Sequence, residues 1–172
     1  MLPTSRRLHK VYPVHLDALN SDAAQRVLAK HSSSLLPQAF PEGSPCHHSY
    51  GQGHGAVAGA CATILKAVFD ENAIIVDPKV PRTELGESGV DVLTEYAGPD
   101  KEMLTVGGEA NKLAANIALG RCHAGVSFRS DYERSLILGE EVAISVLRDQ
   151  KATFNESASW KFTRFDGTTM AI

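Results

Sequence analysis

Three histidines and several glycines crowd one short stretch of the sequence, SPCHHSYGQGHGAVAGA at residues 44–60. Its run Gly51-Gln52-Gly53-His54-Gly55 stands where an alanine-rich apolar segment begins. If that segment is a helix, its first backbone N–H groups lack intrahelical partners and can bind an anion, which glycine allows to approach closely. His54 can then exchange a proton with the bound group. Tight helix packing explains the same glycines, so both interpretations stay open.

A second stretch, GRCHAGVSFRSD at residues 120–131, combines cations with groups that carry or accept protons. Arg121 and Arg129 have forked donors that suit oxyanions. The same stretch holds His123, Ser127 and Asp131. The chemistry it suggests is again oxyanion binding with acid–base or nucleophilic groups nearby. An ordinary helix end with solvated charges is the alternative.

The elements that must position these residues are mainly helical. Ser21 is a helix N-cap candidate for a short helix that runs to Lys30. Residues 35–45, LLPQAFPEGSP, contain three prolines and a glycine and exclude regular structure. Residues 54–70 predict a helix that is packed on most sides, because helical spacing relates Val57, Cys61, Ile64 and Val68 while the opposite side is alanine and glycine.

Residues 72–106 contain three prolines and several glycines, and we expect an irregular lid, binding loop or oligomer contact there. A second helix is predicted from about Gly108, and a third from a cap at Ser130 or Asp131 to about Gln150. The tail alternates aromatic residues around Asp166-Gly167, which predicts a hairpin with a type I′ turn.

These elements predict an all-α fold, a helical bundle with long loops and a small C-terminal β-hairpin. We expect a single domain over residues 1–172, divided into a loop-rich segment (1–45), a helical core (46–154) and a hairpin tail (155–172).

Composition excludes several classes of protein. The net charge is −3 and the basic residues form no long patch, so no nucleic-acid partner is expected. The apolar stretches are too short for a membrane span and no signal peptide is recognised, so a cytoplasmic location is predicted. Three cysteines with no metal-binding spacing predict free thiols. A transition-metal site is conceivable, but no spacing supports one, so none is assigned; its candidate ligands are His47, His48, His54 and His123.

Three longer runs, in this order, carry a resemblance to a known family: LLPQAFPEGSPCHHSYGQGHGAVAGACATILKAVFDE, GGEANKLAANIALGRCHAGVSFRSDYERSLILGEEVAISVL and KFTRFDG. They resemble the C-terminal part of the vanadium-dependent bromoperoxidases of algae and cyanobacteria, which are relatives of the type 2 phosphatidic acid phosphatases. The resemblance implies the helical bundle of the vanadium haloperoxidase and acid phosphatase type. It also implies an oxyanion pocket for vanadate or phosphate, and a homodimer or larger homo-oligomer.

Individual residues match the family's site. By the resemblance, Gly53 is a backbone N–H donor to the oxyanion and His54 is the acid–base histidine. Arg121 corresponds to the arginine that holds equatorial oxygens, and His47 to a histidine that lines the halide side. We expect His48 and His123 to line the same pocket.

Other positions depart from the family's pattern. Ser127 stands where the family has the histidine that ligates vanadium, six residues after the arginine. Gln52 replaces an oxyanion-binding serine, and His48 replaces a proline. An upstream lysine and arginine of the family have no clear counterpart. The vanadate site is therefore expected to be incomplete, with no cofactor required and vanadate a remaining option.

We hypothesise a repurposed hydrolase that acts on small esters. In this hypothesis His54 activates Ser127, Asp131 or another carboxylate orients the His54 ring, and the oxyanion is bound by Gly53, Gln52 and Arg121. One alternative is residual bromoperoxidase activity, with vanadate held by His54, His123, Arg121 and the basic residues of the N-terminus. His123 precedes Ser127 by one helical turn and is expected on roughly the same face. A non-catalytic oligomeric module is the other alternative.

Overall fold

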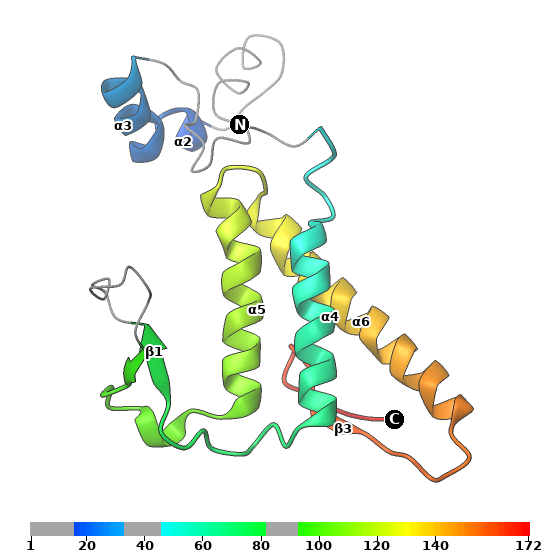
Figure 1. The fold of residues 1–172 in the computed structure, drawn as a ribbon. Helices are drawn as coiled ribbons and strands as arrows, with labels where there is room; N and C mark the ends of the chain where they lie inside the picture. The colour runs from blue at the N-terminus through cyan, green and yellow to red at the C-terminus, as the bar shows by residue number, and fades with distance from the viewer. Residues whose placement is uncertain (1–15, 33–45, 82–92) are drawn as a thin grey trace.

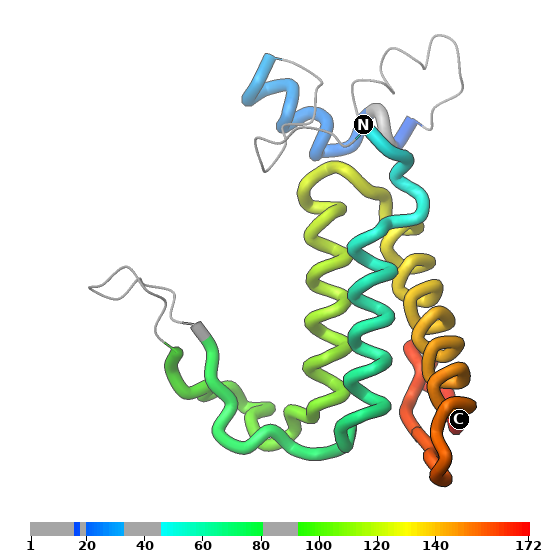
Figure 2. The backbone as a smooth tube through the Cα atoms, turned by 45° about the vertical axis from the view of Figure 1, so that its right-hand side comes forward, coloured from blue at the N-terminus to red at the C-terminus, as the bar shows by residue number. Residues whose placement is uncertain are grey.

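The computed structural model describes residues 16–32, 46–81 and 93–172. Within these ranges three long helices form a bundle: α4 (Gly53–Val68), α5 (Val106–His123) and α6 (Arg129–Thr153). Helix α4 lies between the other two, and α6 crosses it obliquely (Figures 1 and 2). The predicted helical bundle is confirmed. No helix of the described ranges has the length and apolarity needed to cross a membrane.

Two short helices precede the bundle, α2 (Leu16–Leu19) and α3 (Asp22–His31). The side chain of Ser21 accepts a hydrogen bond from the backbone N–H of Ala24, as predicted for a helix N-cap. Helix α3 ends at Ser32, whose left-handed conformation (φ 50°) stops the helix. Helix α2 was not predicted, and the proline-rich residues 35–45 lie outside the described residues.

Helices α4 and α6 touch through their backbones at two glycines. A Cβ atom placed on Gly139 would lie 2.0 Å from the carbonyl oxygen of Ala56. A Cβ atom placed on Gly59 would lie 2.3 Å from the carbonyl oxygen of Leu136. Both distances are far below van der Waals contact, so only glycine fits at either position. The core beside this crossing is made mainly of small side chains: Ala58, Ala62, Ala114, Ala118 and Leu136.

The close crossing corrects our prediction that α4 is packed on most sides. Val57 and Val68 are 65% and 61% exposed, and Cys61 is exposed as well. The buried side of the helix consists instead of Gly55, Ala58, Gly59, Ala62, Thr63 and Lys66. Two helix backbones can approach this closely only through small residues, and the branched apolar residues are therefore turned outward. Whether these outward faces support the expected self-association stays a prediction.

The segment between α4 and α5 is more regular than predicted. Strand β1 (Lys79–Pro81) pairs antiparallel with β2 (Leu93–Glu95), with Val80 opposite Thr94. A 3-10 turn, η1 (Lys101–Met103), follows. Helix α5 begins at Val106, slightly before the expected Gly108, because the side chain of Thr105 accepts a hydrogen bond from the Gly108 N–H.

The start of α6 also differs from prediction. Its N-cap is Phe128, and the helix begins at Arg129, so neither Ser130 nor Asp131 is the cap. Asp131 instead reaches back: its Oδ2 accepts a hydrogen bond from the backbone N–H of Phe128 at 2.8 Å. A carboxylate three residues into a helix can satisfy this otherwise unpaired donor and interacts favourably with the helix dipole.

The C-terminal hairpin is confirmed, but its predicted turn type is wrong. Strand β3 (Lys161–Thr163) pairs with β4 (Thr169–Ala171), with Phe162 opposite Met170. A type I′ turn needs positive φ at both central residues, whereas in this loop only Gly167 has it (φ 83°). The Gly167 N–H donates to the Arg164 carbonyl, which fits a longer loop that closes on a left-handed glycine.

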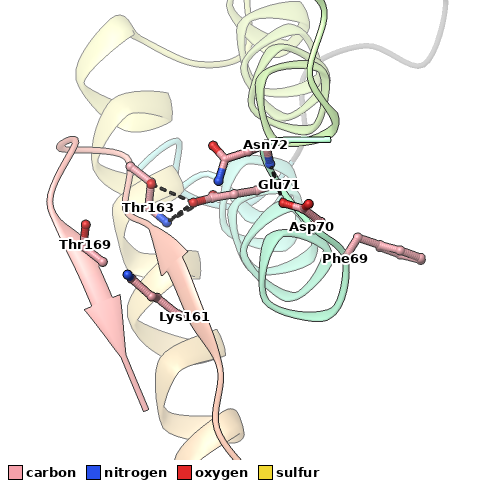
Figure 3. A pocket seen from close by; sticks show the side chains of 7 residues that line it. All are labelled: Phe69, Asp70, Glu71, Asn72, Lys161, Thr163 and Thr169. Atoms are coloured by element: carbon pink, nitrogen blue, oxygen red, sulfur yellow. Dashed lines mark hydrogen bonds between the residues drawn. The ribbon is translucent and has the colours of Figure 1, made fainter. Parts of the chain in front are cut away.

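Buried charged groups fasten the hairpin to the bundle. Both carboxylate oxygens of Glu71 accept from the backbone N–H of Thr163, and Oε1 also accepts from its hydroxyl (Figure 3). The Lys66 ammonium donates to the Thr163 carbonyl at 2.6 Å. Glu140 accepts from the Phe165 N–H at 2.7 Å and pairs with the Arg164 guanidinium at 3.1 Å.

Apolar packing completes the attachment. Phe162 is fully buried against Ile144 and Leu147 of α6. The Lys66 ammonium also lies 4.5 Å from the centroid of the Phe165 ring. Lys66 and Glu140 are each only 1% exposed, so this end of the bundle contains a buried polar network. Each member of such a network stabilises the hairpin only while its partners are present.

The glycine crossing gives a first prediction. Gly139→Ala should lower the free energy of unfolding by about 1–3 kcal/mol or more, because its methyl group would overlap the α4 backbone. Gly120→Ala is the matched control, since no atom lies within 4 Å of a Cβ there. The control should be neutral or up to about 1 kcal/mol more stable. Urea unfolding followed by circular dichroism measures both; equal stability of the two variants would contradict the assigned contact.

Burial of Lys66 gives a second prediction. Desolvation lowers the pKa of Lys66 below its usual 10.5, although Glu140 and Glu71 partly oppose this. Between the lowered folded value and 10.5 the unfolded chain binds more protons, so this group makes the protein more stable as pH rises. The stability of wild type relative to Lys66→Met should therefore increase toward pH 10.5.

A control with the opposite sign is available for this measurement. The hydrogen bond to Glu95 raises the pKa of the Lys101 ammonium. The stability of wild type relative to Lys101→Met should therefore be kept up to about pH 10.5 and fall as pH rises above it, by a small amount because the pair is exposed. Urea unfolding at several pH values gives both differences. A flat difference for Lys66→Met would contradict a desolvated ammonium.

Candidate functional site

A cavity of about 70 Å³ lies at the N-terminal end of α4. Three segments form it: the chain just before and into α4, the last turn of α5, and the link between α5 and α6. It is lined by His47, Ser49, Gln52, Gly53, His54, Arg121, Val126 and Ser127. The structure thus brings together most of the residues that the sequence singled out, from two stretches almost 70 positions apart.

Helix α6 fixes the point at which α4 begins. The backbone N–H of Gln52, the N-cap residue, donates to the Ser135 hydroxyl at 2.7 Å. A Cβ on Gly51 would lie 3.2 Å from Ser135 Oγ, and one on Gly55 would lie 3.1 Å from Ser135 Cβ. These two glycines therefore allow close packing, which is the alternative that the sequence left open.

Gly53 is different from its two neighbouring glycines. No atom lies within 4 Å of a Cβ placed on it, and the residue is exposed. The first bond within α4 is donated by Ala56 to the Gln52 carbonyl, so the N–H groups of residues 53–55 precede the helical ladder. Together with the positive end of the helix dipole, they favour an anion beside Gly53.

The hydrogen-bond donors of the cavity that suit an anion come from the Arg121 guanidinium and from imidazole side chains. Arg121 is half-buried in the last turn of α5, and no carboxylate among the described residues pairs with it. His54 is exposed in the first turn of α4, and the Nδ1 atom of His47 lies 2.7 Å from the His48 carbonyl. No carboxylate is among the described residues that line the cavity, so its electrostatic character favours an anionic ligand.

The amide of Gln52 is the most unusual group in the cavity wall. The residue is only 3% exposed, yet Nε2 and Oε1 have no hydrogen-bond partner within the described residues. Its side chain also makes no capping bond to α4. A buried amide without partners costs about 1–3 kcal/mol, which a ligand that reaches it would recover.

Three of the expected site residues do not line the cavity. Asp131 is buried, and its carboxylate holds the start of α6, so the structure does not support the expected role of orienting His54. His48 is exposed and contributes its carbonyl to His47. His123 ends α5 and is exposed, while Ser127 follows a left-handed Gly125 (φ 77°). The helical spacing expected between His123 and Ser127 is therefore wrong.

The four-histidine metal site is not formed either. Nowhere in the described ranges do three histidine, cysteine, aspartate or glutamate side chains gather closely enough to hold a metal ion. His47 and His54 share the cavity, whereas His48 and His123 lie outside its lining. Imidazole ligands from only two positions leave a transition metal without a usual coordination set.

Sequence reasoning missed Ser135, which fixes the start of α4 from 83 residues away. A usable signal was present, because Ser135 and Gly139 are four positions apart and small, and therefore share one face of α6. Several of the larger apolar residues of that helix, Leu138, Val142 and Val146 among them, are instead exposed.

A second hollow of about 300 Å³ lies at the other end of α4 (Figure 3). It is lined by Phe69, Asp70, Glu71, Asn72, Lys161, Thr163 and Thr169. The Glu71 oxygens already accept from Thr163, and Asp70 Oδ1 accepts from the Asn72 N–H. Glu71 and Thr163 therefore attach the hairpin, while the bond between Asp70 and Asn72 is local to the chain after α4.

The fold and the cavity define a class: a helical bundle with a histidine, an arginine and an open helix N-terminus around one small cavity. The chain belongs to the family described as the VCPO second helical-bundle domain, whose model matches residues 17–156. This confirms both the recognised family and the fold class.

Named relatives agree with this assignment. Over 140 residues, or 81% of the chain, it is 51% identical to the vanadium-dependent bromoperoxidases of Corallina officinalis and Corallina pilulifera. It is 34% identical to that of Ascophyllum nodosum over 164 residues, or 89% of the chain. The chain spans only 22% of each Corallina protein and 28% of the Ascophyllum protein.

Proposed function

We propose that this chain is an oxyanion-binding domain of the vanadium haloperoxidase type that hydrolyses small esters at the cavity beside α4. The observation that supports the proposal is the shared lining: Ser127 and His54 face the same cavity as Arg121 and the N-terminus of α4. A nucleophile, a base and donors for a developing negative charge are the groups that acyl transfer requires.

The proposed reaction has two halves. In the first, Ser127 Oγ forms a bond to the ester carbonyl carbon while His54 takes the hydroxyl proton. The negative charge on the carbonyl oxygen faces the N–H groups of residues 53–55 and Arg121. The ester C–O bond then breaks, and His54 returns the proton to the leaving alkoxide. In the second half, water attacks the acyl carbon while His54 takes a proton from it; the bond between the acyl carbon and Ser127 Oγ then breaks, His54 returns the proton to Oγ, and the carboxylic acid leaves.

The proposal omits a third catalytic group. Asp131 is engaged at the start of α6, and the part of the chain that the structure describes places no other carboxylate in the cavity lining to orient the His54 ring. Orientation of the base contributes substantially in complete triads. We therefore expect a slower hydrolase than an enzyme with all three groups.

The third prediction concerns these two residues. Ser127→Ala and His54→Ala should each reduce hydrolysis of p-nitrophenyl acetate by about 100-fold or more, since each removes a group that reacts directly. Ser130→Ala and His123→Ala are matched controls, because both residues are exposed and lie outside the cavity lining. The rates are measured from the absorbance of released nitrophenolate, by stopped-flow or steady-state kinetics. Full activity in either cavity variant would exclude the mechanism.

Vanadium-dependent bromoperoxidase activity is the second candidate, and the names of the relatives favour it. Arg121, His54, the Gly53 N–H and the unpartnered Gln52 amide fit a tetrahedral oxyanion such as vanadate. Bound vanadate would supply the oxidation of halide by hydrogen peroxide. Ser127, however, offers a hydroxyl where the family has a ligand imidazole, so binding would rest on hydrogen bonds alone.

The fourth prediction tests this candidate by restoring the imidazole. Ser127→His should bind vanadate about 10- to 100-fold more tightly than wild type, because one strong contact contributes about 1.5–3 kcal/mol. Its vanadate-dependent bromination of phenol red with peroxide and bromide should rise accordingly. Arg121→Ala should lose both binding and bromination. If neither wild type nor Ser127→His depends on vanadate, this candidate is excluded.

A further inference from the structure

We infer that Gln52 makes the cavity selective for tetrahedral oxyanions that carry a proton, such as hydrogen phosphate or hydrogen vanadate, over proton-free ones such as sulfate. The inference rests on the proposed function, in that the cavity must bind an oxyanion. It goes further by naming which oxyanion is accepted and which side chain decides.

The position of Gln52 is fixed by the fold. Its backbone N–H donates to Ser135 Oγ at 2.7 Å, which ties it to α6. A Cβ on Gly55 would lie 2.9 Å from Gln52 Oε1, so the amide sits over the first turn of α4 in space that glycine leaves open. At 3% exposure the side chain has little access to water, and both of its polar atoms lack partners among the described residues.

An amide in this position needs two kinds of partner at once. Nε2 is a donor only and Oε1 is an acceptor only. A sulfate ion offers acceptors alone, so it would pair with Nε2 and leave Oε1 buried and unpaired. An oxyanion with a hydroxyl group pairs with both atoms, because its hydroxyl donates to Oε1 while another oxygen accepts from Nε2. The two oxyanions therefore differ in binding free energy by the cost of leaving one buried acceptor, Gln52 Oε1, without a hydrogen bond.

The family's serine at this position would not discriminate in the same way. A hydroxyl can rotate to donate or to accept, so it pairs with either kind of oxyanion. The amide of Gln52 cannot exchange its two roles except by turning over completely, which again leaves one donor and one acceptor. The replacement of serine by glutamine therefore changes which ligand is favoured.

The charge of the cavity favours the same ligands. Arg121 is the one guanidinium among the described lining residues, and the helix N-terminus adds roughly half a positive charge. The dihydrogen forms of phosphate and vanadate carry a single negative charge, whereas sulfate carries a double one, as do the monohydrogen forms. Since taking excess charge out of water is costly, charge favours the dihydrogen forms beside one guanidinium and two exposed imidazoles, and only the hydrogen bond to Gln52 separates the monohydrogen forms from sulfate.

Calorimetric titration of sodium phosphate and sodium sulfate at pH 7 and equal ionic strength tests the inference. Wild type should bind phosphate at least about tenfold more tightly than sulfate. Gln52→Met, of similar length but apolar, should reduce this ratio to about twofold or less, chiefly by weakening phosphate binding. Gln150→Met is the control, because Gln150 is exposed near the end of α6.

The outcomes separate the two proposals. If neither anion binds wild type, the proposed oxyanion site is wrong. If both bind equally, or if Gln52→Met keeps the full preference, the oxyanion site stands and the role of Gln52 is overturned. If Gln52→Met folds poorly, the ratio of phosphate to sulfate affinity measured on wild type still tests whether the cavity prefers protonated oxyanions. In the absence of anions, Gln52→Met should raise the melting temperature by about 2–4 °C, because it removes an unpaired buried amide.

Discussion

The backbone contact between α4 and α6 is the constraint on which the rest of this structure depends. Gly59 and Gly139 let the two helices touch without side chains between them. That distance brings Ser135 to the backbone N–H of Gln52 and so fixes where α4 begins. At the other end of the crossing it places Lys66 and Glu140 where both can hold the C-terminal hairpin. The same contact between α4 and α6 therefore positions both the cavity and the C-terminal hairpin.

Close packing through small residues has an energetic consequence. Alanines dominate the core at the crossing and bury little apolar surface each, so hydrophobic burial there is modest. The hairpin end of the bundle adds Phe162, Ile144 and Leu147, together with charged groups that are almost fully buried. A buried charge is tolerated only when it is well paired, and Glu140 satisfies this through Arg164 and the Phe165 N–H.

Features fixed by neighbouring residues could be predicted from the sequence, and features fixed by packing could not. The Ser21 cap, the three long helices and the hairpin follow from local patterns, and the resemblance placed His54, Arg121 and Ser127 in one pocket that the structure also forms. The outward orientation of Val57 and Val68 was not predicted because it depends on the contact with Gly139 of α6, far along the chain. Asp131 was expected to orient His54 because a carboxylate can accept a hydrogen bond from an imidazole. In the structure its Oδ2 accepts a hydrogen bond from the backbone N–H of Phe128 instead.

The α4 side and the α5 side of the cavity are attached to the rest of the bundle by different contacts. Gln52, Gly53 and His54 stand on a helix whose start is bonded to α6, whereas Arg121 stands on α5, which touches α6 only slightly and rests mainly on the alanines of α4. Backbone hydrogen bonds from Val106 to Ala73 and from Gly107 to Glu71 tie the start of α5 to the chain after α4, at the end of α5 opposite Arg121. The two walls of the cavity are therefore attached in different ways, one through the hydrogen bond between Gln52 and Ser135 and the other through the packing of α5 on the alanines of α4.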